Sequence, residues 1–325
     1  MEPILEVLEP GLLTTVQDAG RWGYGDLGVP IGGACDPWSF GVANALLGND
    51  AGAAALEITL LGPTLRALRE VVIAIAGADL GARVEPAGRR VAPGSTVRLS
   101  FGEVLAYSDG AGDGGARAYV GVAGGIDVPV VLGSRSTCLV ASFGGFDGRA
   151  LRPGDRISAQ RPGREPDPAR STWPAGLGPR LDAGVRILPG PDAGAELLTA
   201  LTSAPWSVSP ASDRRGVRLT GTPLLVRTDA GSHLTTGVMP GTIQLPPDGQ
   251  PIVLLADAQP TGGYPVIGVV IEADLPLVGQ LAAAEEIRFS LVDQAAARTA
   301  NATRRRDFEA ARRELSAGSW HLSPS

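Results

Sequence analysis

The stretch PIVLLADAQPTGGYP, residues 251–265, contains the pattern that decides the fold of this chain. Its apolar run at 252–256 predicts a buried strand, and the paired glycines that follow predict a turn. The chain has 45 glycines and 27 prolines spread over 325 residues, so we expect short strands joined by turns throughout, and a mainly β fold. Further strands are predicted at 71–76, 116–122, 185–188, 267–271 and 286–291, the last from its strict alternation of apolar and polar residues.

Helices are predicted at few places. The stretch 36–48 begins with an aspartate suited to cap a helix, continues with a proline and ends with a glycine, so a helix is expected between the caps. Shorter helices are expected at 192–201 and 275–284. The polar stretch 293–315 predicts a solvated terminal helix rather than a nucleic-acid-binding arm, because its arginines alternate with acidic residues.

The domain organisation is predicted from a change in composition. Residues 161–184 are rich in proline and glycine and poor in apolar side chains, which is typical of a linker. We therefore expect an N-terminal β-rich domain at 1–160, a linker at 161–184, a second β-rich domain at 185–292 and a polar helical tail at 293–325.

The composition excludes several kinds of chemistry. All 28 basic residues are arginines, so the chain has no lysine for a Schiff base or for a P-loop. Two histidines and two cysteines, scattered along the chain, do not make a structural zinc site, and no metal site is predicted. His233 is the better of two weak candidates for a general base, although a histidine in such a loop is more often simply exposed.

Charge and hydropathy bear on partners and location. A net charge of −6 argues against binding of nucleic acid. The acidic N-terminus is unlike a signal peptide, and no apolar run is long enough to cross a membrane. We therefore expect a soluble, cytoplasmic protein. The GxGxxG match at 23–28 is not interpreted as a dinucleotide site, since no helix can follow it through Pro30 and two glycines.

Two strand ends carry polar side chains suited to a binding site. The apolar stretch that starts at Leu12 ends in Gln17, Asp18 and Arg21, which offer an amide, a carboxylate and a cation that binds anions. An alternative is that Asp18 and Arg21 only stabilise a turn. The run at 252–256 leads to Asp257 and then to a loop with Gln259, Thr261, Gly262, Gly263 and Tyr264, which either binds a ligand or only connects two strands.

Two further stretches leave the same choice open. Residues 212–218 contain Arg214 among other charges, which either clamps a carboxylate or phosphate or belongs to a solvated surface. The turn-rich stretch 237–250 contains two amides, Gln244 and Gln250, and either lines a binding site or merely joins strands.

Taken in order, these motifs resemble the KipA family, also called biotin-dependent carboxyltransferase subunit 2 or the allophanate hydrolase subunit 2-like family. The resemblance extends over about residues 4–292. Four positions depart from the usual motifs: Gly32 stands where the family has serine, Cys35 and Arg215 where it has methionine, and Pro260 where it has threonine. The matching segments are PGLLTTVQD (10–18), GR (20–21), GVP (28–30), ACD (34–36), ANALLGN (43–49), ALEIT (55–59), AGGIDVP (123–129), VLGSRST (131–137), SDR (212–214), PPDGQP (246–251) and TGGYP (261–265).

The resemblance implies a cyclophilin-like β-barrel among a few short helices, and a role as one subunit of an ATP-dependent 5-oxoprolinase that opens the lactam of 5-oxoproline to L-glutamate. The partners would be the KipI-like and the LamB/YcsF-like subunits of that enzyme. ATP is expected at the level of the complex, no biotin is attached to this chain, and the chain is expected to be inactive alone. Two alternatives are a regulatory protein that binds and antagonises a KipI-like histidine-kinase inhibitor, and a carboxyltransferase subunit that acts on urea or another amide with carboxybiotin.

The motif chemistry then suggests roles for single residues. Arg21 and Arg214 are expected to face an anionic carboxylate or phosphate, and Asp18 and Asp257 to orient the reacting amide or water. Asp18, Arg21 and Asp257 are the predicted catalytic residues. The predicted substrate-binding residues are Gln17, Arg214, Gln259, Thr261, Gly262, Gly263 and Tyr264.

Overall fold

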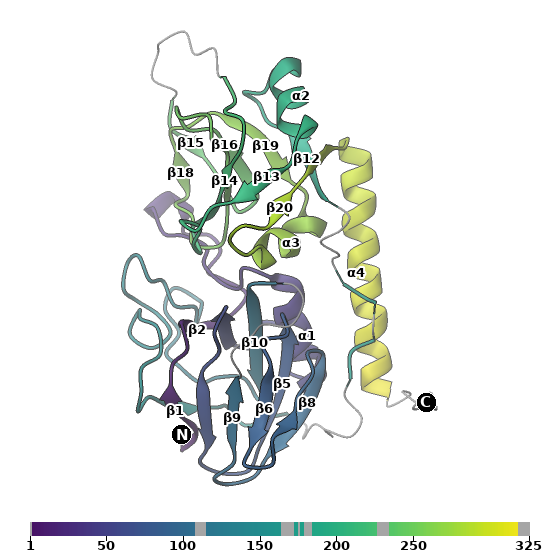
Figure 1. Cartoon of the computed structure of the whole chain (residues 1–325). Coiled ribbons are helices and arrows are strands. Elements are labelled where there is room, and N and C mark those ends of the chain that lie inside the picture. The colour runs from purple at the N-terminus through teal and green to yellow at the C-terminus, as the bar shows by residue number, and fades with distance from the viewer. Residues whose placement is uncertain are drawn as a thin grey trace. The chain divides into compact units, whose positions relative to one another are not determined.

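The computed structural model of the chain describes residues 2–107, 115–163, 172–174, 176–178, 184–225 and 234–317. These residues fall into two compact units (Figure 1). Unit 1 is formed within Met1–Arg21, Asp36–Leu177 and Arg306–Ser325, and unit 2 within Trp22–Cys35 and Gly178–Arg305. Much of the predicted linker, together with His233 and His321, lies outside the described residues.

Unit 1 is built on two antiparallel sheets that enclose a common core (Figure 1). Leu5 and Leu65 from one sheet and Ile58 and Ile73 from the other belong to the same buried cluster, as in a β-sandwich. Among the described residues the six-stranded sheet has the order β11–β1–β4–β9–β6–β7, with β1 (Pro3–Glu9), β4 (Thr64–Ala67), β6 (Ala82–Glu85), β7 (Arg89–Arg90), β9 (Val104–Tyr107) and β11 (Arg156–Ser158). The five-stranded sheet has the order β2–β3–β10–β5–β8, with β2 (Leu13–Gln17), β3 (Ala55–Thr59), β5 (Val71–Gly77), β8 (Ser95–Leu99) and β10 (Arg117–Val122).

Helix α1 (Pro37–Leu47) packs on strands β5 and β10 of the second sheet. The Asp36 carboxylate accepts a hydrogen bond of 3.0 Å from the Ser39 amide, and Gly48 ends the helix in the left-handed conformation at a φ of 65°. The predicted helix and both of its caps are therefore confirmed.

Helix α4 (Gln294–Ala317) forms over the stretch predicted to be helical, and its last turns belong to unit 1. There Phe308 contacts Trp38 and Trp173, with ring centroids 5.1 Å from each. In unit 2, Arg305 of the same helix forms a salt bridge of 2.7 Å with Glu272. The helix is thus packed against other residues at Phe308, whereas its Arg305 pair is exposed.

Unit 2 is a barrel whose sheet closes through one continuous segment. The end strands β20 and β21 are separated only by Arg288, so this segment pairs with β13 on one side and with β12 on the other. The mainly β fold with a barrel and few helices is therefore confirmed. In the described part of unit 2 the eight strands have the order β20–β13–β14–β17–β16–β19–β12–β21, with β12 (Val185–Pro189), β13 (Trp206–Val208), β14 (Gly216–Thr220), β16 (Thr242–Gln244), β17 (Ile252–Leu254), β19 (Val266–Val270), β20 (Glu286–Ile287) and β21 (Phe289–Leu291).

Local differences from the predicted elements have physical causes. Helix α2 (Ala195–Ser203) begins after Gly194 and not at Asp192, because the Asp192 carboxylate accepts a hydrogen bond from the Val266 amide instead of capping the helix. Helix α3 (Leu275–Gln280) ends before Ala284, which adopts a φ of 68°. A short ribbon of β15 (Thr236–Gly237) and β18 (Thr261–Gly262) completes unit 2.

The segment Trp22–Cys35 belongs to unit 2 although its sequence neighbours belong to unit 1. It contains a short 3₁₀ helix at Gly25–Leu27, so the GxGxxG match lies in a turn and not between a strand and an α-helix. The Gly32 amide donates to the Ala256 carbonyl at 2.9 Å, and Cys35 joins the core of the barrel.

None of the helices in the described part of the chain combines the length and the apolar character that crossing a membrane requires.

A pH-dependent stability is expected from Tyr107 in unit 1. Burial raises the pKa of its phenol, and the hydroxyl has no hydrogen-bond partner among the described residues. An unfolded tyrosine ionises near pH ~10, so the free energy of unfolding should fall above that pH by up to about 1.4 kcal/mol per pH unit. Tyr107→Phe removes this loss.

Urea unfolding of both proteins at about pH 8 and about pH 11 measures the effect. We expect Tyr107→Phe to be at least as stable as the wild type at the lower pH, because an unpartnered buried hydroxyl is costly. Its advantage should grow at the higher pH. An advantage that stays constant between the two pH values would contradict this prediction.

Candidate functional site

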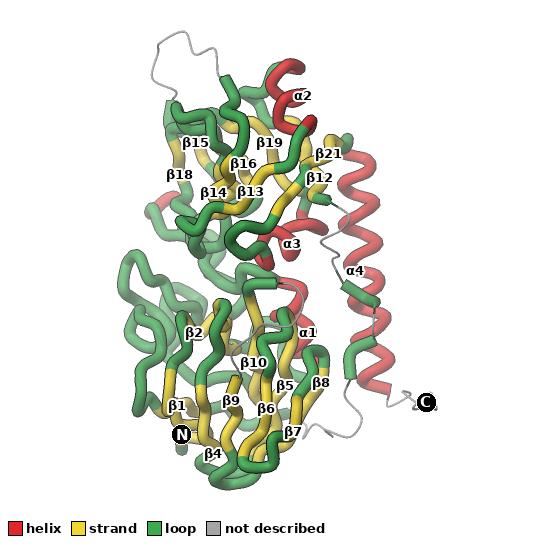
Figure 2. The backbone as a smooth tube through the Cα atoms, viewed as in Figure 1, coloured by secondary structure: helices red, strands yellow, loops and turns green. Residues whose placement is uncertain are grey.

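The predicted residues of unit 1 lie at the end of β2 and are bound by a loop from much later in the chain. Residues 123–155 run as loops and turns joined by isolated bridges (Figure 2). The Asp18 carboxylate accepts hydrogen bonds from the Ser134 hydroxyl at 2.7 Å and the Ser136 hydroxyl at 2.5 Å. The backbone amides of Gly20 and Arg135 donate to it at 2.8 and 2.6 Å. Asp18 therefore holds this loop against the end of β2.

Arg21 and Gln17 are bound to the same loop. Arg21 is 1% exposed, donates to the Ser136 carbonyl at 2.5 Å and lies 4.7 Å from the centre of the Phe143 ring. The Gln17 amide donates to the Thr137 carbonyl at 3.3 Å. Gly144 permits this packing, since a Cβ there would lie 2.1 Å from the Ser136 carbonyl oxygen. Ser136 links the two charged residues, because its hydroxyl donates to Asp18 and its carbonyl accepts from Arg21.

In unit 2, Arg214 and Asp257 form a buried bidentate ion pair. The Arg214 Nε and Nη2 atoms donate to the two carboxylate oxygens of Asp257 at 2.9 and 3.0 Å, and both residues are 3% exposed. Arg214 also donates to the Gly33 carbonyl at 2.8 Å and contacts the Cys35 sulfur at 3.3 Å. The pair thus fastens residues 33–35 to the barrel. Its neighbour Arg215, in contrast, is exposed and pairs with Asp213.

The loop after Asp257 is exposed. Gln259, Thr261 and Gly263 reach the surface, and Tyr264 is 43% exposed. Gly262 is buried against the side chain of Gln244, since a Cβ at Gly262 would lie 2.1 Å from the Gln244 Nε2 atom. On the outer side, a Cβ at Gly25 would lie 3.6 Å from Pro260, so the segment 22–35 flanks this loop.

The predicted residues are therefore brought together in separate groups. Gln17, Asp18 and Arg21 lie in unit 1, and the others lie in unit 2. Within unit 2, the Asp257 pair lies beyond Leu254 at one end of β17. Gln244 pairs with Ile252 at the other end of that strand, and Gly262 lies against Gln244. Sequence reasoning assigned no role to Ser134, Ser136 or Gln244, although the first two belong to a quoted motif and Gln244 was noted as an amide in a long loop.

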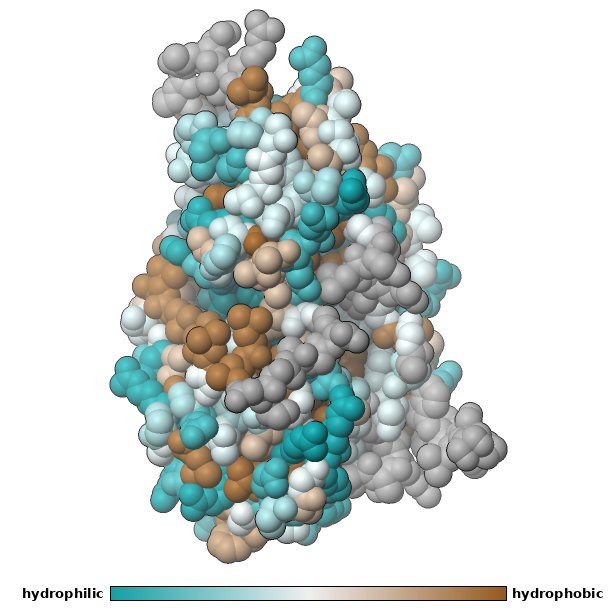
Figure 3. Space-filling view, in the orientation of Figure 1, coloured by the Kyte–Doolittle hydropathy of each residue, from teal (hydrophilic) through white to brown (hydrophobic). Residues whose placement is uncertain are grey.

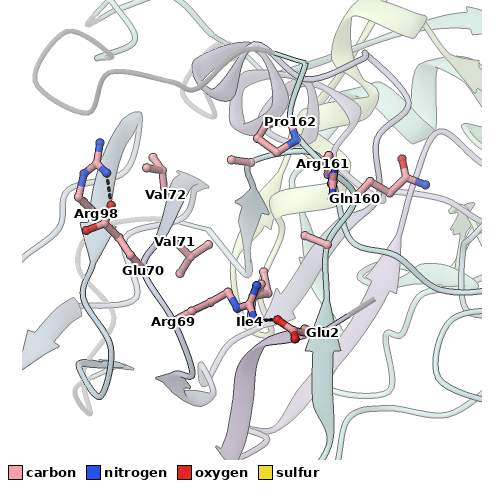
Figure 4. A pocket seen from close by; sticks show the side chains of 12 residues that line it. Glu2, Ile4, Arg69, Glu70, Val71, Val72, Arg98, Gln160, Arg161 and Pro162 are labelled. Atoms are coloured by element: carbon pink, nitrogen blue, oxygen red, sulfur yellow. Dashed lines mark hydrogen bonds and ion pairs between the residues drawn. The ribbon is translucent and has the colours of Figure 1, made fainter.

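A cavity of about 570 Å³ lies elsewhere in unit 1 (Figure 4). Its charged lining is mostly paired, because Arg69 bonds to Glu2 and Arg98 bonds to Glu70. None of the predicted site residues lines it. Among the described residues there is also no group of three or more His, Cys, Asp and Glu side chains that could hold a metal ion.

Both units expose large apolar side chains. Figure 3 shows hydrophobic residues gathered in patches on the visible face of the molecule. In unit 2, Trp22 and Leu27 of the segment 22–35 are 68% and 70% exposed. In unit 1, the exposed apolar residues include Leu12, Val130 and Val140. Contiguous patches of such residues, unlike single exposed ones, mark surfaces that other proteins cover.

Comparison with known proteins confirms the family suggested by the motifs. Residues 27–291 match the family described as "Carboxyltransferase domain, subdomain A and B". The chain is 38% identical to the C subunit of Escherichia coli 5-oxoprolinase over 311 residues, which cover 94% of this chain and 97% of that protein.

Two longer proteins contain a similar part. The urea amidolyase of Lachancea kluyveri is 34% identical over 320 residues, which cover 90% of this chain and 17% of that protein. The crystal structure of Kluyveromyces lactis urea carboxylase aligns with a TM-score of 0.87 and 32% identity, covering 99% of this chain and 30% of that chain. The chain therefore spans less than a third of each of these two relatives.

Loss of one partner of the buried pair in unit 2 is expected to be costly. Asp257→Ala leaves the Arg214 charge buried without its carboxylate, which typically costs about 3–5 kcal/mol of unfolding free energy. Asp213→Ala is the matched control, because it breaks the exposed pair with Arg215 and should cost about 1 kcal/mol or less. Chemical unfolding of both variants measures the difference, and equal losses would contradict the assignment.

Two adjacent glycines allow a test of the contact between the loop and Gln244. Gly262→Ala should lower the unfolding free energy by about 1–3 kcal/mol, because its Cβ meets the buried Gln244 amide. Gly263→Ala should leave it within about 0.5 kcal/mol, because the nearest atom to a Cβ there is 3.8 Å away. Thermal and urea unfolding compare the pair. A larger loss in Gly263→Ala would show that the loop packs differently.

Proposed function

Because the chain belongs to the family of carboxyltransferase domains with subdomains A and B, we propose that it is one component of an ATP-dependent 5-oxoprolinase. This complex would open the lactam of 5-oxoproline to L-glutamate. The observation that carries the proposal is the similarity to the C subunit of the Escherichia coli 5-oxoprolinase, which extends over nearly the full length of both chains.

The reaction requires activation of an amide. A lactam carbonyl is a weak electrophile, and transfer of the γ-phosphoryl group of ATP to its oxygen makes its carbon a stronger one. Water then adds to that carbon, the ring C–N bond breaks with the nitrogen leaving as the amine, and the γ-glutamyl phosphate that forms is hydrolysed to glutamate and phosphate. Hydrogen-bond donors and cations around the oxygen stabilise the negative charge that develops there. Arginine, amide, hydroxyl and backbone groups suit this task, and this lysine-free chain is rich in them.

Different roles are proposed for the buried and the exposed residues. Within unit 1, Arg21 is proposed as a cationic group and Asp18 as a group that orients the reacting amide or water. Within unit 2, Arg214 and Asp257 are proposed for the same two roles. Since all four are buried and bonded to their own loops, each also acts as a positioning residue. Direct contacts with substrate are proposed for the exposed loop that contains Gln259, Thr261, Gly263 and Tyr264.

The remaining chemistry is assigned to partners. We propose that these are a KipI-like protein and a LamB/YcsF-like protein, with ATP bound at the level of the complex, in the cytoplasm. Biotin cannot be attached to this chain through a lysine, because it has none. The exposed apolar side chains of both units offer surface for such partners to cover.

A second candidate function is supported by the likeness to urea carboxylase along 99% of the chain. In that case the chain would form part of a carboxyltransferase, which moves the carboxyl group of carboxybiotin, carried by another protein, to a nitrogen of urea. Both candidates place a small amide in the site.

Reconstitution of the three proposed subunits tests the first function. We expect hydrolysis of ATP that depends on 5-oxoproline, with one glutamate formed for each ATP hydrolysed. Both rates should fall to background when this chain is omitted. Parallel reactions with urea and a carboxylated biotin carrier test the second function. Full 5-oxoproline-dependent turnover by the KipI-like and LamB/YcsF-like proteins without this chain would contradict the proposed role.

A further inference from the structure

Gln244 carries a buried carboxamide that the fold does not use. The residue ends strand β16 and is 2% exposed. Its Nε2 atom is buried and has no hydrogen-bond partner among the described residues.

Such a group disfavours the folded state. A buried amide without a partner typically costs about 1–3 kcal/mol, and an apolar side chain of the same shape avoids this cost. Gln250, six residues later, shows what a structural glutamine does here: its Oε1 accepts from the Gly221 amide and its Nε2 donates to the Gly221 carbonyl. Stability alone therefore does not explain a glutamine at position 244.

The position of the carboxamide suggests its use. It faces the backbone of Gly262, in the loop that offers exposed hydroxyl and phenol groups from Thr261 and Tyr264. The covering ribbon of β15 and β18 has two residues in each strand, and an isolated ribbon of this kind is marginally stable (Figure 1). At Gly262 the carboxamide is therefore covered by a ribbon that is separate from the eight-stranded sheet of the barrel.

A primary carboxamide presents one donor and one acceptor side by side. A lactam presents the complementary pair, since its N–H and its carbonyl lie on the same side of a cis amide. Urea also presents an N–H beside its carbonyl. A lactam or urea can therefore form two hydrogen bonds with one glutamine.

We propose that Gln244 binds the amide group of the substrate, with Nε2 donating to the carbonyl oxygen and Oε1 accepting from the N–H. The choice of a small amide as the ligand rests on the proposed function. The observation that the Gln244 carboxamide lies unused under Gly262 does not depend on that function. The ligand class is a cyclic or primary amide with a free N–H beside its carbonyl, bound beneath the loop of Thr261–Tyr264.

The first test uses the reconstituted complex. Gln244→Met should raise the KM for 5-oxoproline at least tenfold while the thermal midpoint of the chain stays the same or rises. Gln250→Met is the matched control: it should lower the thermal midpoint, through loss of the two bonds to Gly221, and leave KM unchanged. Gln244→Glu, which keeps the shape but loses the donor, should also raise KM at least tenfold, and it should lower the thermal midpoint because a buried carboxylate without a partner is costly. An unchanged KM in both Gln244 variants would overturn the proposal.

The second test does not depend on turnover. In the full chain labelled with ¹⁵N-glutamine, the side-chain signal that disappears in Gln244→Glu is titrated with 5-oxoproline, 2-pyrrolidinone, urea and N-methyl-2-pyrrolidinone. The signal should shift saturably with each ligand that has an N–H. The affinity measured from this shift should be at least tenfold lower for the N-methyl lactam. A complex without 5-oxoprolinase activity would defeat the proposed function alone. The absence of a shift with all four ligands, or an equal response to the N-methyl lactam, would overturn the assignment of Gln244.

Discussion

Two buried charges, on Arg214 and Asp257, organise unit 2 around the predicted binding loop. Both carboxylate oxygens of Asp257 accept hydrogen bonds from Arg214. The same guanidinium group also donates to the Gly33 carbonyl and contacts the Cys35 sulfur. Residues 22–35 are thereby fastened to the barrel, and their Gly25 lies against Pro260 of the loop. A buried ion pair adds little net stability, but loss of one partner is costly. Its effect here is to fix where the segment and the loop meet.

Unit 1 uses a carboxylate in the same way. Asp18 gathers two serine hydroxyls and two backbone amides, and so fixes the loop that also binds Arg21. Chemistry alone would assign the carboxylates of Asp18 and Asp257 to catalysis. In the structure, each of them holds a loop in place. Groups that can reach a substrate are then found in the exposed loop at 259–264 and in the unused carboxamide of Gln244. This division of work suits a chain that completes its site with partner proteins.

Local features were predictable from the sequence, and long-range ones were not. The helix at 37–47 was predicted with both caps because its signals lie within the helix itself. The alternation at 286–291 predicted a strand but not its division between two partners, which closes the barrel. Asp257 and Arg214 were each singled out, yet their pairing spans 43 residues and has no local signature. The unsatisfied amide of Gln244 depends on every neighbour, so only the fold reveals it.

The central claim, that the barrel loop and Gln244 bind the reacting amide, is tested most directly by locating the ligand. A crystal structure of the chain with its partner proteins and 5-oxoproline would do so. The account predicts the lactam within hydrogen-bond distance of the Gln244 carboxamide, beneath the loop of Thr261–Tyr264. A ligand seated instead in the cavity lined by Arg69 and Arg98, or held entirely by the partner proteins, would contradict it.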